Sequence, residues 1–173
     1  MHGHQESVSK LPTIESVPGI FATQPTRYIL PARRNPQSSR PLIEKASSAE
    51  NQGRPLALVV DDVADLADML ALFLAQAGYE VTAVNSAFSA IDAAENTRFD
   101  VIISDIGMPR MNGYQLAQSL RALPEYAAVP MIAVTGFSTY DDEERSLKSG
   151  FDAHITKPID TDGLFQLIER LRG

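Results

Sequence analysis

Hydrophobic runs and amphipathic stretches alternate from residue 55 to the end of the chain. Short runs that contain β-branched residues predict buried strands. The five expected strands are Leu56–Val60, Glu80–Val84, 99–103, 129–134 and Ala153–Thr156. Each run is followed by a segment whose hydrophobic residues recur at intervals of three or four, or by a polar stretch of helical length. The pattern therefore predicts a helix after every strand.

The five expected helices differ in how amphipathic they are. Their apolar positions, in chain order, are Leu66, Met69, Leu70, Phe73 and Leu74, then Phe88 and Ile91, then Leu116, Leu120 and Leu123, then Leu147 alone, and finally Leu164, Leu167, Ile168 and Leu171. The first helix should end at Gly78 and the fourth, over 140–149, at Gly150, because glycine favours helix C-termini. With one aliphatic residue, the fourth helix should bury little surface and have low local stability.

Strands that alternate with helices predict an α/β fold in which helices cover both faces of a parallel sheet. Right-handed crossovers and short loops leave few arrangements of five such units. We expect the flavodoxin-like, doubly wound (βα)5 fold with strand order 2-1-3-4-5. Open sheets of this kind bind ligands at the carboxyl ends of their strands, and that edge is where functional residues should gather.

Residues 1–54 have a different character. They contain six of the eleven prolines, at positions 12, 18, 25, 31, 36 and 41, so no helix or strand of useful length fits between them. We expect a disordered, proline-rich N-terminal extension over 1–54, followed by one domain over 55–173. The stretch 27–34 (RYILPARR) is the one part with an apolar and basic character, and we favour an inert linker over a docking peptide.

Composition and charge narrow the function classes. The chain of 173 residues is 44% hydrophobic, enough for one ordinary domain and a tail. Residues 1–54 carry seven Lys/Arg and four Asp/Glu (+3), whereas 55–173 carry eight and eighteen (−10), which together give −7. An acidic domain disfavours nucleic-acid binding. There is no cysteine, and no apolar run is long enough for a membrane helix or a signal peptide, so we expect a cytoplasmic protein.

Polar residues stand where the expected strands run out. They are Asp61 and Asp62 after the first strand, Asp105 after the third, Thr135 after the fourth and Lys157 after the fifth. An acidic pair alone is most often a helix N-cap, and a lone strand-end threonine or lysine is most often structural. In the expected sheet, however, the first and third strands are neighbours. The three carboxylates should therefore converge.

Convergence has a chemical consequence. Carboxylates a few ångströms apart repel by about 4 kcal/mol per pair at an effective dielectric near 20. A hard divalent cation relieves this repulsion, and Mg²⁺ suits best because it accepts one or two carboxylates and keeps room for phosphate oxygens. Asp105 could then accept a phosphoryl group, with Lys157 supplying positive charge and the Thr135 hydroxyl and Gly136 amide binding a phosphoryl oxygen.

Residues 55–173 resemble the receiver domain of two-component response regulators. The motifs that carry the resemblance are Val-Val-Asp-Asp at 59–62, Asp-Ile-Gly-Met-Pro-x-Met-Asn-Gly at 105–113, Ala-Val-Thr-Gly at 133–136 and Thr-Lys-Pro at 156–158. They follow one another in the family's order and approximate spacing, over the whole domain.

The resemblance implies specific roles. Asp105 would be phosphorylated by the phosphohistidine of a sensor histidine kinase or a histidine phosphotransfer protein. Asp62, Asp105 and the carbonyl of Gly107 would bind Mg²⁺, and Asp61 would act mainly through water. The other implied roles are a bridge from Lys157 to the phosphoryl group, structural positions at Pro109 and Gly113, and a cis bond before Pro158.

Two positions depart from the family's pattern. The family's switch aromatic is replaced here by His154. We expect phosphorylation to draw Thr135 inward and His154 to follow it. Because histidine titrates near neutral pH, we also expect the side-chain rotamer of His154 to depend on pH. Gly107 and Phe137, two residues beyond Asp105 and Thr135, cannot orient a hydrolytic water. We therefore expect slow self-dephosphorylation.

The leading expectation is a phosphorylated signalling module that changes its face around the helix over 140–149, the strand Ala153–Thr156 and the last helix, and three other functions compete with it. A phosphatase of the haloacid dehalogenase type also uses Asp, Thr, Lys and Mg²⁺, but its two acids follow the first strand as Asp-x-Asp. A phosphate sink or relay is the second. An adaptor that needs no phosphorylation is the third, and the complete acidic pocket disfavours it. No output domain is recognisable, so we expect a stand-alone regulator or a fragment of a larger one.

Overall fold

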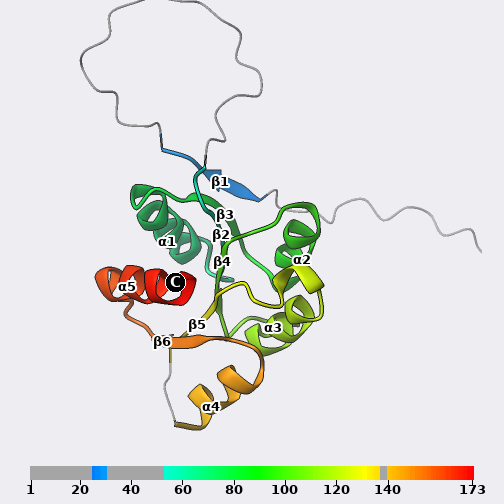
Figure 1. Ribbon diagram of the computed structural model, residues 1–173. Helices are drawn as coiled ribbons and strands as arrows, with labels where there is room; N and C mark the ends of the chain where they lie inside the picture. Colours follow the sequence, from blue (N-terminus) through cyan, green and yellow to red (C-terminus); the bar gives the residue numbers. More distant parts are fainter. Residues whose placement is uncertain (1–24, 31–52, 137–139) are drawn as a thin grey trace, which may run out of the picture.

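The computed structural model describes residues 25–30, 53–136 and 140–173, and within them it contains one six-stranded sheet (Figure 1). The strands are β1 (Thr26–Tyr28), β2 (Leu56–Val60), β3 (Glu80–Val84), β4 (Val101–Asp105), β5 (Met131–Thr135) and β6 (Ala153–Thr156). Their order is β1-β3-β2-β4-β5-β6. The last five pair in parallel, which confirms the predicted order 2-1-3-4-5.

Five α-helices and a short 3₁₀ helix connect the strands. They are α1 (Ala64–Gln76), α2 (Ala87–Asn96), α3 (Gly113–Arg121), η1 (Pro124–Tyr126), α4 (Tyr140–Lys148) and α5 (Thr161–Arg172). One hydrophobic cluster joins the sheet to α1 and α5, and a second joins it to α2 and α3. The helices on the two faces and the sheet between them form three layers (Figure 1). Helix α4 lies beside β6. The alternation of side chains along each strand places half of them in either cluster.

Local sequence signals explain where several helices begin and end. Asn112 caps α3 and forms a reciprocal capping box with Gln115, and Asp160 caps α5 through the amide of Asp162. The chain leaves α1 through Gly78, at φ 99°, and leaves α4 through Gly150, at φ 107°. A left-handed residue at this position favours glycine, as predicted.

The sequence-based boundaries need small corrections. The third and fourth strands begin two residues later than predicted and run through Asp105 and Thr135, because Phe99 and Val129 are buried in the loops that precede them. Apolar spacing also overstated the burial of helix faces. Met69 and Phe73 on α1, and Phe88 on α2, are among the exposed large hydrophobic residues.

The absence of any strand from residues 1–54 was a wrong prediction. Residues Thr26–Tyr28 pair antiparallel with β3, in the register Thr26 with Ala83 and Tyr28 with Val81. Five residues lie between Pro25 and Pro31, which leaves room for a three-residue strand, and the open edge of β3 supplies backbone groups for it to pair with. The predicted disorder of residues 1–24 and 31–52 lies outside the described residues.

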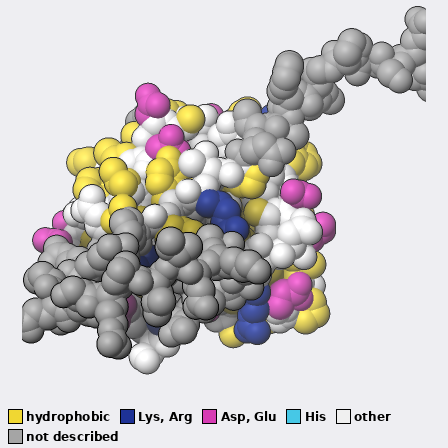
Figure 2. Space-filling model, turned by 90° about the horizontal axis from the view of Figure 1, so that it is seen from above, with side chains coloured by type: hydrophobic (Ala, Val, Ile, Leu, Met, Phe, Trp, Pro, Cys, Tyr) yellow, Lys and Arg dark blue, Asp and Glu magenta, His cyan; other side chains and the backbone are white. Residues whose placement is uncertain are grey.

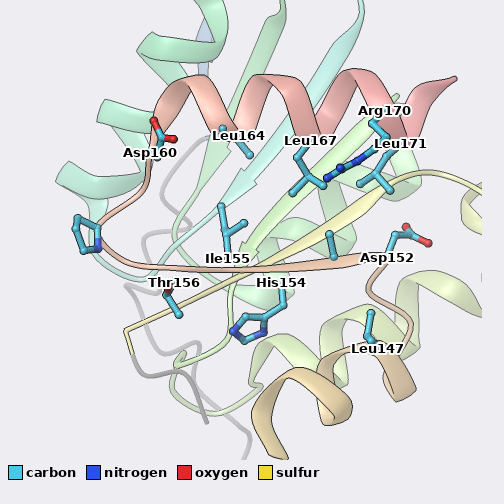
Figure 3. A pocket seen from close by; sticks show the side chains of 13 residues that line it. Leu147, Asp152, His154, Ile155, Thr156, Asp160, Leu164, Leu167, Arg170 and Leu171 are labelled. Carbon is cyan, nitrogen blue, oxygen red and sulfur yellow. The ribbon is translucent and has the colours of Figure 1, made fainter. Parts of the chain in front are cut away.

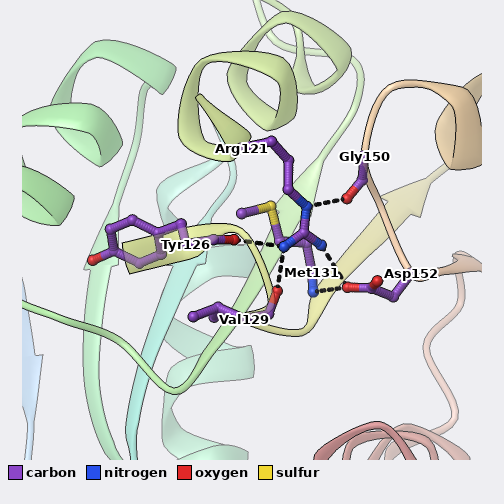
Figure 4. A network of polar contacts seen from close by, with 6 residues as sticks. All are labelled: Arg121, Tyr126, Val129, Met131, Gly150 and Asp152. Atoms are coloured by element: carbon purple, nitrogen blue, oxygen red, sulfur yellow. Dashed lines mark hydrogen bonds and ion pairs between the residues drawn. The ribbon is translucent and has the colours of Figure 1, made fainter. Parts of the chain in front are cut away.

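A buried arginine network joins the ends of α3, η1 and the α4–β6 turn (Figure 4). Arg121 donates to the carbonyls of Gly150 (2.7 Å), Tyr126 (2.7 Å) and Val129 (2.8 Å), and to the carboxylate of Asp152 (2.6 Å). The same Asp152 oxygen accepts from the amide of Met131 at 2.8 Å. One guanidinium thus satisfies three carbonyls that no sequence pattern had connected.

None of the helices in the described parts of the chain is both long enough and apolar enough to cross a membrane.

Candidate functional site

The carboxyl ends of β2, β4 and β6 bring an acidic pair and a lysine together. Lys157 Nζ lies 2.8 Å from Asp61 Oδ2 and 2.8 Å from Asp105 Oδ1. The side chains of Asp61 and Asp105 are only 10% and 8% exposed, and that of Lys157 is 27% exposed. One ammonium group therefore pairs with two nearly buried carboxylates at the ends of neighbouring strands.

The two carboxylates change the ionisation of the lysine. Burial by itself lowers the pKa of Lys157, but hydrogen bonds to Asp105 and Asp61 outweigh it, and the net result is a pKa above the ordinary 10.5. A raised pKa means that folding favours the charged form. The lysine's contribution to stability is therefore complete below pH 10.5 and is lost as the pH rises through the higher folded-state value.

We expect Lys157→Met to lower the free energy of unfolding by about 2 kcal/mol at neutral pH, because the charge-assisted hydrogen bonds are lost and two buried carboxylates repel. Chemical denaturation from pH 7 to pH 11 measures the difference between the two proteins. It should stay constant to about pH 10 and shrink above that, in line with the linkage of pKa to stability.

The matched control is Lys148→Met. Lys148 pairs with Glu144 at 2.7 Å, but both side chains are exposed, at 72% and 54%. Such a pair contributes at most about 1 kcal/mol. A difference for Lys157→Met that is as small as that of the control, or that does not fall at alkaline pH, would contradict the assigned role of the lysine.

The second oxygen of Asp105 is held by the backbone. Asp105 Oδ2 accepts the amide of Gly107 at 2.6 Å, and a Cβ at residue 107 would lie 3.2 Å from that oxygen. Glycine thus keeps the loop close enough to orient the carboxylate. Gly113 is still tighter, because a Cβ there would lie 2.4 Å from the carbonyl oxygen of Asp105. The structural role expected at Gly113 has a physical reason in this contact.

The other predicted residues occupy the same edge in different ways. Asp62 is exposed, whereas its neighbour Asp61 is buried and accepts the amide of Val63 at 2.9 Å. Thr135 is half-buried at the end of β5, paired with Thr156, and Gly136 is exposed. The predicted cis bond between Lys157 and Pro158 is confirmed. Phe137 lies outside the described residues.

The donor atoms at this edge fit Mg²⁺ better than any softer metal, because they are carboxylate oxygens. In the described part of the chain, no three Asp, Glu or His side chains are grouped closely enough to hold a metal between them. The predicted convergence of three carboxylates is therefore not found, since Asp61 and Asp105 are paired with Lys157 instead. Mg²⁺ needs only one or two carboxylates, so the site still suits it.

His154 sits on β6, beside the site and turned toward α4 (Figure 3). Its Nδ1 is 3.0 Å from the Ser146 hydroxyl of α4, and its Nε2 is buried without a hydrogen-bond partner among the described residues. A groove of about 690 Å³ runs along β6 and α5 next to it. Leu164, Leu167 and Leu171 line this groove from α5 (Figure 3).

An apolar pocket of about 480 Å³ opens directly beside the acidic pair. The residues that line it include Leu66, Met69, Leu70 and Phe73 of α1, Ile159 in the loop before α5, and Asp61, Asp105 and Lys157 at its polar end. Figure 2 shows hydrophobic side chains gathered on the left of the visible face, the side on which Figure 1 places α1. Met69 is 47% and Phe73 36% exposed.

The sequence had assigned these α1 residues to the core, so their place beside the site was missed. The width of the apolar stripe on α1 could have indicated this second role. The hydrophobic positions of α1 span more of the helix surface than one face needs, because Leu72 adds to the predicted stripe. A stripe wider than one sheet-facing side indicates a second contact surface.

Known proteins resemble this chain in sequence. A family model described as the response regulator receiver domain matches residues 57–169. The polar-differentiation response regulator DivK of Brucella anthropi is 34% identical over 96 residues, which cover 56% of this chain and 78% of DivK. The sensor histidine kinase RcsC of Salmonella typhi is 32% identical over 139 residues, which cover 78% of this chain but only 14% of the kinase.

A solved structure agrees with these relatives. The receiver domain of sensor histidine kinase PA1611 from Pseudomonas aeruginosa PAO1, with a magnesium ion coordinated in its active site cleft, has a TM-score of 0.65 and 29% identity. The match covers 70% of this chain and 99% of that one. The whole of that receiver domain therefore corresponds to part of the present chain.

Proposed function

Because the chain belongs to the response regulator receiver domain family, we propose that Asp105 accepts a phosphoryl group from a phosphohistidine and that the phosphorylated domain signals by binding another protein. The observation that carries the proposal is the contact of Lys157 with both Asp61 and Asp105, because it places a positive charge beside a nearly buried carboxylate. A carboxylate becomes a phosphoryl acceptor only when nearby cations disperse the developing charge.

Phosphoryl transfer to Asp105 forms one bond to phosphorus and breaks another. An oxygen of Asp105 forms a bond to phosphorus, the bond from phosphorus to the histidine nitrogen breaks, and its electron pair returns to the imidazole. Lys157 then turns from Asp105 to a phosphoryl oxygen while it keeps its contact with Asp61. The Thr135 hydroxyl and the Gly136 amide bind a second oxygen. Asp62, Asp105 and the Gly107 carbonyl would hold Mg²⁺, which would supply further positive charge when bound.

The apolar pocket beside the site favours a helical phosphodonor. Leu66, Met69 and Phe73 lie on one side of α1, and they adjoin Asp105 across a pocket of about 480 Å³. An amphipathic helix that lays apolar residues into such a groove would present a histidine on the same face to Asp105. We therefore propose that a sensor histidine kinase or a histidine phosphotransfer protein docks here.

On the output side, the proposed switch runs through α4, β6 and α5. The hydrogen bond between His154 and Ser146 ties β6 to α4 and is the contact that a movement of His154 would break. The domain would catalyse only its own phosphorylation and a slow dephosphorylation, so we do not propose an enzyme. The family match gives no support to a haloacid dehalogenase activity. Action as a phosphate sink or relay and a cytoplasmic location stay predictions.

Phosphotransfer from purified, radiolabelled histidine kinases and phosphotransfer proteins, with Mg²⁺, tests the proposal. We expect at least one donor to label the wild-type protein and none to label Asp105→Asn. Asp92→Asn is the matched control, because Asp92 is an exposed carboxylate on α2. Label retained by Asp105→Asn would refute the site, and failure of a broad donor panel together with small phosphodonors would refute the function.

A further inference from the structure

The N-terminal strand occupies an edge that the five-stranded domain would leave open. In the order β1-β3-β2, strand β3 would be the edge strand without β1, with unpaired amides and carbonyls along one side. In the described parts of the chain, Thr26–Tyr28 cover this edge, opposite Val81–Ala83. The pairing is antiparallel, whereas every other pairing in the sheet is parallel.

A buried carboxylate on β3 gives this edge its specificity. The Glu80 side chain is only 8% exposed, and Arg27 of β1 forms an ion pair with it. Among the described residues, Arg27 is the cation that neutralises Glu80. Removing the cation from a nearly buried carboxylate strongly destabilises the folded protein. The edge therefore favours a strand with a basic side chain at the middle position.

Two further sets of contacts hold the residues that follow Arg27. Tyr28 and Leu30 pack against the hydrophobic cluster beneath α1 and α5. Arg54 donates to the Leu30 carbonyl at 2.5 Å. The segment is thus recognised by charge and by apolar packing as well as by its backbone.

The family's domain does not include this strand. The receiver family model matches residues 57–169, which begin after β1. Residues 53–173 contain the whole of that match, so we expect them to fold on their own. The strand is joined to β2 only through residues 29–55. A short strand on a long connection can leave its site without unfolding the domain.

We propose that the β3 edge is a docking site for an extended segment with arginine and tyrosine in succession, filled in cis by residues 25–30 and in trans by the same residues of a second copy. Every copy carries both the site and its ligand, which is the condition for reciprocal strand exchange. The charges favour this occupant, because the domain carries −10 and residues 1–54 carry +3. Tethering keeps the cis form dominant until the protein approaches the effective concentration of the tether, on the order of 1 mM.

The site is tested with the domain 53–173 and a fluorescent peptide of residues 24–31. Anisotropy should show saturable binding, and the peptide with Arg27→Glu should bind about tenfold more weakly or worse, as expected for loss of a charged contact. The domain with Glu80→Lys should reverse this preference. The full-length chain should bind the peptide more weakly than the domain, because its own strand competes. Equal binding of both peptides, or no binding, would overturn the proposal.

The second copy is tested by sedimentation equilibrium of the full-length chain from about 10 μM to about 1 mM, a range chosen to reach the effective concentration of a tether. We expect dimer to appear toward the upper limit and to be lost with Arg27→Glu. A protein that stays monomeric throughout, or a dimer that Arg27→Glu leaves unchanged, would overturn exchange between copies. Peptide binding needs no domain variant, so poor folding of Glu80→Lys would not obscure the result.

Discussion

Replacing Arg121 with alanine should lower the free energy of unfolding by about 3–4 kcal/mol, because it leaves several buried acceptors without a donor at once. The guanidinium serves Gly150, Tyr126 and Val129 through their carbonyls, and its own side chain is only 18% exposed. Water can reach some of these groups after truncation, which is why the expected loss is less than the sum of the separate hydrogen bonds.

Urea denaturation of wild type, Arg121→Ala and Arg121→Lys measures this effect. Lysine keeps the charge but lacks the planar fork, so Arg121→Lys should recover less than half of the loss. Arg98→Ala is the control, because Arg98 is an exposed arginine in the loop between α2 and β4, and it should change stability by less than about 0.5 kcal/mol. A loss for Arg121→Ala that is no larger than for Arg98→Ala would show that the network does not stabilise the fold.

Replacing Gly113 with alanine should cost about 3 kcal/mol, at the upper end for overpacking, and should also slow phosphorylation of Asp105. The added Cβ would lie 2.4 Å from the Asp105 carbonyl oxygen and 2.9 Å from Ile106 Cα. Both are backbone atoms, so the strand end that carries the phosphoacceptor must move. Gly113 also donates to the Ile106 carbonyl at 3.0 Å, which links the start of α3 to the same strand end.

Gly163→Ala provides the matched control. Its Cβ would lie 2.7 Å from Asp160 Oδ2, the end of a side chain that can rotate away. We expect a change of less than about 1 kcal/mol, partly offset by the better helix propensity of alanine. Thermal unfolding and the rate of labelling by a small phosphodonor are measured for both variants. Wild-type stability and labelling in Gly113→Ala would show that the backbone yields without cost.

Much of the fold follows from local sequence. The strand Glu80–Val84 and the helix after it are marked by residue type alone, and the turn glycines at 78 and 150 adopt the left-handed conformation expected of them. The same reasoning failed for Met69 and Phe73, because the helical period says which residues share a side but not how wide a side the sheet covers. It also missed Arg121, whose partners lie between 5 and 31 residues away along the chain.

The candidate site shows the same division. Strand ends and the expected sheet order are enough to place Asp61, Asp105 and Lys157 on one edge. Their actual pairing was not predictable, since a lysine at the end of β6 could have faced solvent. The distance of 2.8 Å to each carboxylate is a result of how far β2, β4 and β6 are shifted relative to one another.

By itself, the sequence determined the parallel α/β fold, the strand order and the identity of the acidic and basic residues at the carboxyl edge. Periodicity and strand-end position are local properties, and each can be read without knowing what lies opposite. Tertiary structure alone decided that Lys157 holds Asp61 and Asp105 together, that α1 offers an apolar pocket beside them, and that Arg27 pairs with Glu80. These contacts join residues far apart in the chain, and only the packed sheet brings them within reach of one another.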